Sequence, residues 1–199
     1  MAEYSLADTL LKIEGVNLTL GGKLILRDVN AEVKDVRREG MQQGQVVGLL
    51  GPSGVGKTRL FRILAGLDQP DSGRVLLGSE GKPVNRGSVG VVAQDYPLFA
   101  HRTVLSNRMV AARQVNKSES ECQTLLERFG LAGHEKKYPA QLSGGQRQRV
   151  SIAQQLLCSD DLLLMDEPFS GLDLVALGTV IRFLGEIAAA DELKTFVIV

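Results

Sequence analysis

The chain has few of the features that would assign it to a special class at once. Its two cysteines, Cys122 and Cys158, are too few for a disulfide framework and indicate a reducing compartment. No apolar run approaches the roughly 18 residues that a membrane helix needs. The N-terminus has no long apolar stretch behind a positive start, so we expect no secretory signal. Neither sign of charge is in excess, since 23 basic residues balance 23 acidic ones, which argues against a nucleic acid held mainly by charge.

What is present is the composition of an ordinary globular protein. The 199 residues, of which 44% are hydrophobic and 23% charged, suit one domain, or one domain with an inserted subdomain. Apolar periodicity predicts strands at 46–50, 74–77, 89–93, 162–165 and 196–199, and helices at 58–67, 118–129, 146–158 and 174–192. Strands that alternate with helices predict a mainly parallel sheet, and therefore an α/β fold.

The first third of the chain reads differently. Residues 10–26 alternate loosely around Gly21 and Gly22, which predicts a β-hairpin, and residues 29–33 continue as strand. The charged and polar segment 34–44 is expected to be an exposed loop. The run Val46–Leu50 that follows is apolar throughout, and this pattern is typical of a strand buried on both faces.

The sharpest motif follows that strand and opens a helix. It matches the phosphate-loop pattern G-x-x-x-x-G-K-[ST] in full, over Gly51, Pro52, Ser53, Gly54, Val55, Gly56, Lys57 and Thr58. Glycines let successive N–H groups curl around a phosphate, and the helix N-terminus adds its positive dipole end. Lys57 supplies a charge to the β- and γ-phosphates, and the Thr58 hydroxyl can ligate Mg²⁺. The alternative is a glycine-rich turn that binds nothing.

Two acids close another apolar strand, residues 162–165. Asp166 and Glu167 therefore lie at the carboxyl edge of the predicted sheet, where ligands bind in open α/β folds. Asp166 can hold magnesium through water, and Glu167 could orient or deprotonate an attacking water. Taken alone, the pair could equally be a strand cap.

A third motif separates families. Ser143, Gly144, Gly145 and Gln146 precede a helix, so the two glycines form a second anion cradle with Ser143 as hydroxyl donor and cap. One nucleotide needs no second cradle unless that cradle acts on a neighbouring copy. In their order along the chain, the phosphate loop, the Ser143–Gln146 motif and the acidic pair together resemble the ATP-binding cassette (ABC) family of ATPases. The resemblance covers nearly the whole chain.

The resemblance implies an architecture. It is a P-loop NTPase (RecA-like) core with a mainly parallel sheet, an N-terminal antiparallel β subdomain and an inserted α-helical subdomain. The core would take residues 1–94 and 161–199, and the helical subdomain residues 95–160. Gln94 matches the glutamine that touches Mg²⁺ and senses the membrane partner, 97–99 and 102–104 resemble the permease-facing segment, and 170–173 resemble the loop that crosses the dimer interface.

The resemblance also implies a mechanism. Two copies, or this chain and a paired ABC subunit, would close head to tail on ATP and Mg²⁺, with Lys57, Gln94 and Glu167 as catalytic residues. Thr58, Gln94 and Asp166 would hold the metal. The dimer would energise import of a small solute through integral-membrane permease subunits, from a cytoplasmic position on the inner face of the membrane.

The sequence departs from the family pattern at several positions. The family has a switch histidine after the last strand, and the printed sequence ends at Val199, so we expect truncation ahead of that residue and weak hydrolysis. His101 and His134 lie too far upstream to replace it, and are expected to make surface or partner contacts. Leu20 stands where an aromatic residue usually stacks on adenine. Arg59, counted with the nucleotide-binding residues, replaces a small hydroxyl residue and alters one phosphate contact.

Two alternatives to the transport ATPase therefore stay open. The first is an ATP-binding module with little or no hydrolysis. The second is a soluble ABC protein that acts outside transport, although members of that class usually carry two cassettes or long coiled-coil insertions, and neither is visible here.

Overall fold

The computed structural model describes residues 4–38, 44–95, 97–114, 118–158, 162–170, 174–190 and 195–199. The elements in these ranges, in chain order, are β1 (Tyr4–Leu20), β2 (Lys23–Arg38), β3 (Gln45–Gly48), α1 (Lys57–Leu64), β4 (Ser72–Leu77), β5 (Lys82–Pro83), β6 (Gly90–Val92), α2 (Val104–Gln114), α3 (Glu119–Arg128), a 3₁₀ turn (Pro139–Gln141), α4 (Gly144–Cys158), β7 (Leu162–Met165), α5 (Leu174–Ala190) and β8 (Thr195–Ile198).

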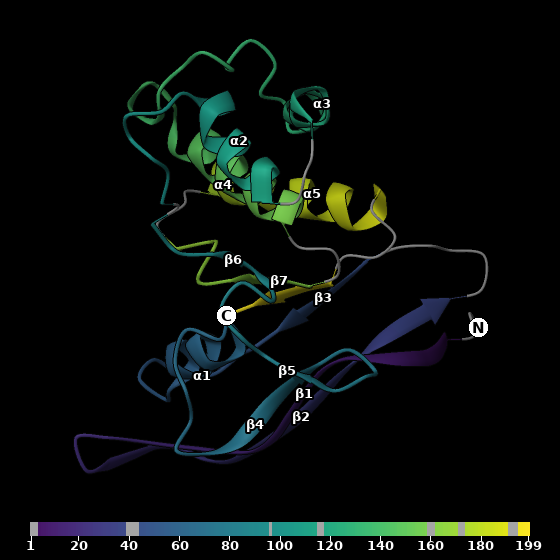
Figure 1. Ribbon diagram of the computed structural model, residues 1–199, viewed down its shortest axis with the longest axis vertical. Helices are drawn as coiled ribbons and strands as arrows, with labels where there is room; N and C mark the ends of the chain where they lie inside the picture. Colours follow the sequence, from purple (N-terminus) through teal and green to yellow (C-terminus); the bar gives the residue numbers. More distant parts are fainter. Residues whose placement is uncertain are drawn as a thin grey trace.

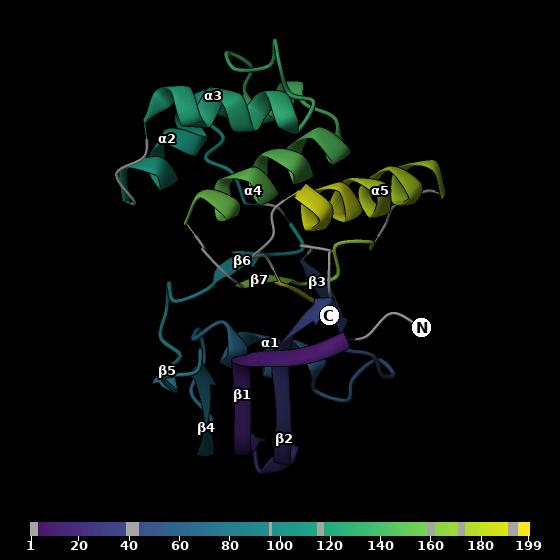
Figure 2. The same cartoon turned by 90° about the vertical axis from the view of Figure 1, so that its right-hand side faces the viewer.

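The strands form two four-stranded sheets. One is antiparallel, in the order β2-β1-β4-β5, and the other is parallel, in the order β3-β8-β7-β6. Figure 1 shows the helices α2 to α5 on one side of the parallel sheet, and α1 and the antiparallel sheet on the other. The view turned by 90° shows the same order of layers (Figure 2). The expected fold class, a parallel sheet with an antiparallel β part and a helical part, is confirmed.

Strand β7 is apolar at every position because a core lies on each of its faces. Leu162 and Leu164 pack with α1 and β1, whereas Leu163 and Met165 pack with α4 and α5. All four side chains are buried. Successive residues of a strand point to opposite faces, so a strand between two cores needs an apolar residue at each position.

Two expectations about the first strands are wrong. Residues 34–38 were expected in a loop, but they extend β2, where Arg38 pairs with Tyr4 and Val36 with Leu6 of β1; residues 39–43 lie outside the described part. The run 46–50 was expected to be buried on both faces, yet Val46 is 54% exposed and Leu50 91%. In the described chain β3 is an edge strand of the parallel sheet, paired only with β8.

The helical layer forms its own clusters. Ser118 caps α3 as expected, because the Glu121 amide donates to Ser118 Oγ and the Ser118 amide donates to the Glu121 carboxylate. Cys122 on α3 is buried against α2 and α4, in keeping with a small core side chain. None of the described helices is both long enough and apolar enough to cross a lipid bilayer.

Arg108 on α2 is an exception within this layer, because its guanidinium is fully buried. Its Nη1 donates to the carbonyl of Cys122, but Nε and Nη2 have no hydrogen-bond partner among the described residues. Burial lowers the pKa of Arg108 to about 10. A buried cation with unfilled donors costs free energy, since it loses its hydration without replacing it.

We therefore expect the Arg108→Met substitution to raise the free energy of unfolding by about 2 kcal/mol at neutral pH. Methionine fills a similar volume and has no donor to leave unpaired. The folded-state pKa of Arg108 is lowered, so burial of its charge destabilises the folded protein fully at pH values below about 10. This destabilisation shrinks as the pH rises above about 10, because the folded protein then releases the proton. Urea denaturation of both proteins measures the difference, and Arg128→Met on the exposed face of α3 is the matched control. A lower urea midpoint for Arg108→Met would contradict the prediction.

Candidate functional site

The phosphate-loop sequence joins β3 to α1. Helix α1 begins at Lys57 without a side-chain cap, and Gly56 is its N-cap residue. Lys57 Nζ donates to the carbonyl oxygens of Gly51 and Pro52, each at 2.9 Å, so the lysine lies across its own loop. The N–H groups of the first turn of α1 therefore lie beside a cation, an arrangement suited to an anion.

Glycine is required at position 56 for two reasons. Its φ is +100°, a conformation that other residues rarely adopt. A Cβ there would lie 3.0 Å from Leu26 Cδ2 and 3.1 Å from Ile25 Cγ2. The loop can thus close against β2 only because this residue has no side chain.

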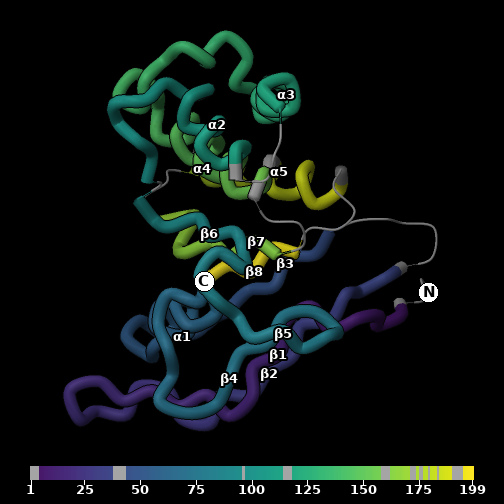
Figure 3. The backbone as a smooth tube through the Cα atoms, viewed as in Figure 1, coloured from purple at the N-terminus to yellow at the C-terminus, as the bar shows by residue number. Residues whose placement is uncertain are grey.

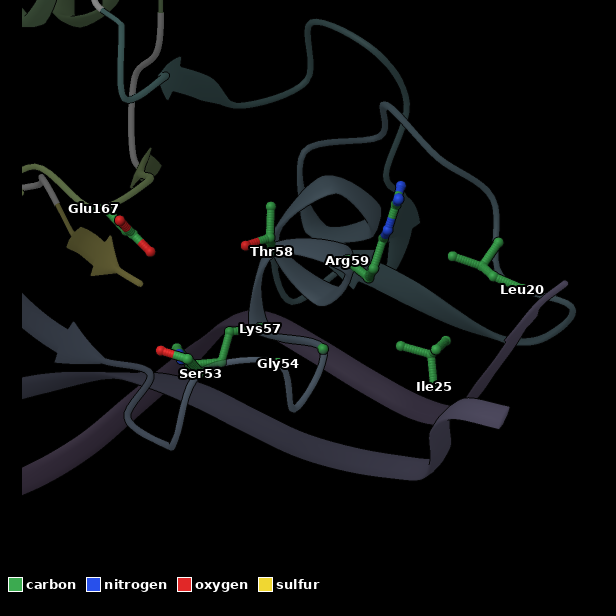
Figure 4. A pocket seen from close by; sticks show the side chains of 9 residues that line it. Leu20, Ile25, Ser53, Gly54, Lys57, Thr58, Arg59 and Glu167 are labelled. Atoms are coloured by element: carbon green, nitrogen blue, oxygen red, sulfur yellow. The ribbon is translucent and has the colours of Figure 1, made fainter. Parts of the chain in front are cut away.

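A cavity of about 350 Å³ opens at the loop. It is lined by Leu20, Ile25, Ser53, Gly54, Gly56, Lys57, Thr58, Arg59 and Glu167 (Figure 4). The fold thereby brings Glu167, at the end of β7, to the loop between β3 and α1. The smooth backbone trace shows β3, β8 and β7 side by side, which accounts for this approach (Figure 3).

The acidic pair lies at the carboxyl edge of the parallel sheet, as expected. The Asp166 amide donates to the Val92 carbonyl and the Glu167 amide to the Val199 carbonyl, which fixes both residues between neighbouring strands. Burial raises the pKa of Asp166, and the adjacent Glu167 carboxylate raises it further. A nearby cation would relieve this repulsion.

Gln94 belongs to the same group. Its Nε2 donates to Glu167 Oε2 at 3.2 Å and to Ser170 Oγ at 3.3 Å. Both of these hydrogen bonds use the amide nitrogen of Gln94, so its amide oxygen can act as an acceptor or ligand for another group. Residues 171–173 of the expected interface loop lie outside the described part.

The donor set fits a magnesium ion. Thr58, Gln94 and Asp166 offer a hydroxyl, an amide oxygen and a carboxylate, the hard oxygen ligands that Mg²⁺ prefers. The described residues contain no cluster of three His, Cys, Asp or Glu side chains that could hold a metal alone. This favours an ion held jointly by protein and substrate phosphates, the usual arrangement for Mg²⁺.

The second cradle, Ser143–Gln146, lies at the start of α4 and does not line the cavity. The Ser143 amide donates to Gln146 Oε1 at 2.9 Å, and the Gln146 amide donates to Ser143 Oγ at 3.2 Å. The reciprocal pair uses the amides of Ser143 and Gln146. The amides of Gly144 and Gly145 belong to the first turn of α4, where N–H groups have no acceptor within the helix. Within one chain, therefore, the two cradles stay separate.

Two contacts at the site had no signal in the sequence. His134 Nε2 lies 2.8 Å from Gln146 Nε2, so this histidine forms a side-chain hydrogen bond with a residue of the second cradle. Ile25 of β2 lines the cavity because Gly56 lets the loop approach it.

His101 contacts Phe99 edge-on with the ring centroids 6.1 Å apart, in the segment expected to face a permease.

Comparisons with known proteins give a consistent set of relatives. A family model described as "ABC transporter" matches residues 36–170. The chain is 37% identical over 195 residues to the Fe(3+) ions import ATP-binding protein FbpC 2 of Rhodococcus jostii, covering 94% of this chain and 54% of that protein. It is 40% identical over 171 residues to the spermidine/putrescine import ATP-binding protein PotA of Spiroplasma citri, covering 82% and 47%. The chain thus spans about half the length of the curated relatives it matches.

A solved structure is similar over most of the chain. That of cbiO1 from Clostridium perfringens, described as part of the ABC transporter complex cbiONQ, superposes with a TM-score of 0.80 and 29% sequence identity. It covers 96% of this chain and 78% of the other. A second structure, of an ABC transporter ATP-binding subunit, has a TM-score of 0.74 at 24% identity and supports the fold alone.

Proposed function

Because this chain belongs to the ABC transporter family, we propose that it binds and hydrolyses ATP to energise the import of a small solute. One observation carries the proposal: Lys57, Thr58 and Glu167 meet in a single cavity although they come from distant segments. A phosphate-binding loop that faces a carboxylate is the arrangement that nucleotide hydrolysis requires.

In this proposal the chain's own groups perform each step. The loop amides and Lys57 bind and orient the triphosphate. Thr58, Gln94 and Asp166 would hold Mg²⁺, which supplies charge neutralisation on the phosphates when bound. Glu167 accepts a proton from the water whose oxygen attacks the γ-phosphorus, the bond to the bridging oxygen breaks, and ADP and phosphate leave.

The second cradle completes the site from another molecule. Ser143 and the amides of Gly144 and Gly145 lie outside the cavity of their own chain, so they would bind the γ-phosphate held by a partner. The core, residues 1–94 and 161–199, holds one half of the site, and the helical subdomain, residues 95–160, presents the other. ATP would then stabilise the closed dimer, and hydrolysis would release it.

The partner in the membrane would be an integral-membrane permease. Phe99 is an exposed aromatic residue with the Arg102 guanidinium 5.4 Å from its ring centroid, close in sequence to Gln94. A contact there would transmit closure of the dimer to the permease, and would hold the protein at the cytoplasmic face of the membrane. The solute itself would be selected by other subunits.

Association in the presence of a nucleotide tests the proposal. We expect the protein to double in mass, measured by light scattering, with Mg²⁺ and a non-hydrolysable ATP analogue but not with ADP. Ser143→Arg should stay monomeric while still binding the analogue, because Ser143 does not line its own cavity. Ser79→Arg, on an exposed turn, is the matched control. A wild-type protein that stays monomeric, or a Ser143→Arg variant that dimerises normally, would refute the shared site.

A further inference from the structure

His134 lies beside the second cradle, in the turns that follow α3. These turns are anchored by Leu131, which is fully buried in a core to which α4 also contributes. The His134 amide donates to the Leu131 carbonyl, and the His134 carbonyl accepts from the Lys137 amide, each at 3.0 Å. The backbone of His134 is therefore held on both sides, and its imidazole reaches Gln146 in the first turn of α4.

The partners of the imidazole decide which of its two nitrogens carries the hydrogen. Nδ1 lies 3.2 Å from the carbonyl oxygen of Ala132. A carbonyl oxygen only accepts, so Nδ1 carries the hydrogen in the neutral ring and Nε2 is an acceptor. Gln146 Nε2, which lies 2.8 Å away, therefore donates to His134 Nε2.

The carboxamide of Gln146 is thereby held in one orientation. Its oxygen accepts from the Ser143 amide at 2.9 Å, while its nitrogen donates to His134. If the carboxamide turned over, its nitrogen would face the Ser143 N–H, a second donor, and its oxygen would face His134 Nε2, a second acceptor. His134 thus selects the orientation in which Gln146 forms its reciprocal pair with Ser143.

We propose that His134 is a positioning residue for the second cradle: as a hydrogen-bond acceptor it fixes Gln146, and through Gln146 the Ser143 hydroxyl, before a partner's nucleotide arrives. The inference rests on the proposed shared site and adds to it a residue that does not line the cavity. A cradle that is already ordered loses less conformational entropy on binding than one that its ligand must order. ATP-driven association should therefore be tighter with His134 than without it.

Three substitutions of His134 separate hydrogen bonding from shape. Glutamine offers an oxygen acceptor at a similar reach, leucine fills space without an acceptor, and lysine has donors only. Analytical ultracentrifugation with Mg²⁺ and the non-hydrolysable ATP analogue would give the dissociation constant of each dimer. We expect His134→Leu and His134→Lys to dimerise about tenfold more weakly than the wild type, because Gln146 must then be ordered at each of two sites. His134→Gln should stay close to the wild type, as should the control Lys136→Gln at an exposed position of the same segment.

Further measurements separate this role from folding and from nucleotide binding. The affinity for ADP, which is not expected to form the dimer, should be equal in all the variants, because His134 does not line the cavity. Thermal melting checks that each variant is folded. Nitrogen NMR of the labelled wild-type protein should show the hydrogen of neutral His134 on Nδ1. The chain has two histidines, so His101→Gln identifies the signal of His134.

The contrary results each overturn a distinct claim. A His134→Leu variant that dimerises as tightly as the wild type, or a neutral His134 with its hydrogen on Nε2, would overturn the positioning role. A His134→Gln variant as weak as His134→Leu would show that the shape of the ring matters and its acceptor does not, which would overturn the hydrogen-bond account. A wild-type protein that stays monomeric with the analogue would refute the shared site itself, and with it the proposal on which the inference rests.

Discussion

Replacement of Glu167 by glutamine should slow ATP hydrolysis by about a thousandfold, the usual contribution of a general base. Glutamine keeps the shape of the side chain and an oxygen that can still accept from Gln94 Nε2, 3.2 Å away in the wild-type protein. What it loses is the ability to take a proton from water. The effect should therefore appear in turnover, and the affinity for ATP should change little.

The same variant should accumulate as a dimer with ATP and Mg²⁺, because the step that reopens the dimer is blocked. Phosphate release measures turnover, and light scattering measures the mass. Glu80→Gln, at an exposed position that pairs with Lys82, is the control and should behave as the wild type. Equal turnover in Glu167→Gln and the wild-type protein would remove Glu167 from the catalytic step.

The conformation of Glu167 supports a specialised role. Its φ is +44°, in the left-handed region, which non-glycine residues seldom occupy. The surrounding hydrogen bonds hold it there, since the Glu167 amide donates to Val199 and the Ser170 amide donates to the Glu167 carbonyl. Backbone of this kind gathers at functional sites, where the neighbouring structure maintains it. No pattern in the sequence indicates this conformation.

The turn between β3 and α1 could be predicted from local sequence because all its requirements are local. A strand delivers the chain, glycines allow the turn, and a helix starts at Lys57, within eight consecutive residues. Strand β7 was predictable for a similar reason. Its four apolar residues have no polar face to offer, which favours a place between two cores, and a core does lie on each of its faces.

Strand β3 shows where a local pattern is insufficient. The run 46–50 is as apolar as β7, yet Val46 is exposed, because β3 lies at one end of the order β3-β8-β7-β6. That order is set by pairings between distant strands, which the run itself does not encode. Likewise, the mostly charged segment 34–38 was expected to be a loop, although its backbone pairs with β1, and the side chains of residues 34–37 are exposed or half-buried. The charged residues here occupy solvent-accessible positions of a strand and do not mark its end.

The candidate site divides in the same way. Lys57, Thr58, Asp166 and Glu167 follow from motifs, whereas the contact of Gln94 with Glu167 depends on the two strands β6 and β7 being neighbours. Ile25 joins the cavity only through the close approach at Gly56. Residues that complete a site from another element become visible once the strand order is known.

Replacement of Lys57 by alanine should weaken binding of ATP by about a hundredfold, since it removes the charge-assisted hydrogen bonds to the β- and γ-phosphates. The loop should keep its path, because the glycine conformations at positions 54 and 56 do not depend on the lysine. It would lose the two contacts from Lys57 Nζ to the carbonyls of Gly51 and Pro52. Thermal melting of the variant would reveal any cost of that loss separately from nucleotide affinity.

The comparison that isolates the charge is between triphosphate and monophosphate. Titration with analogues of ATP and with AMP should show a large loss for the triphosphate and almost none for AMP, which has no β- or γ-phosphate for Lys57 to reach. Lys82→Ala, at an exposed strand end paired with Glu80, controls for the loss of a positive charge alone. If Lys57→Ala weakened both nucleotides equally, the lysine would be supporting the shape of the cavity. If it weakened neither, the loop would not be the phosphate site, and the cavity would need another ligand.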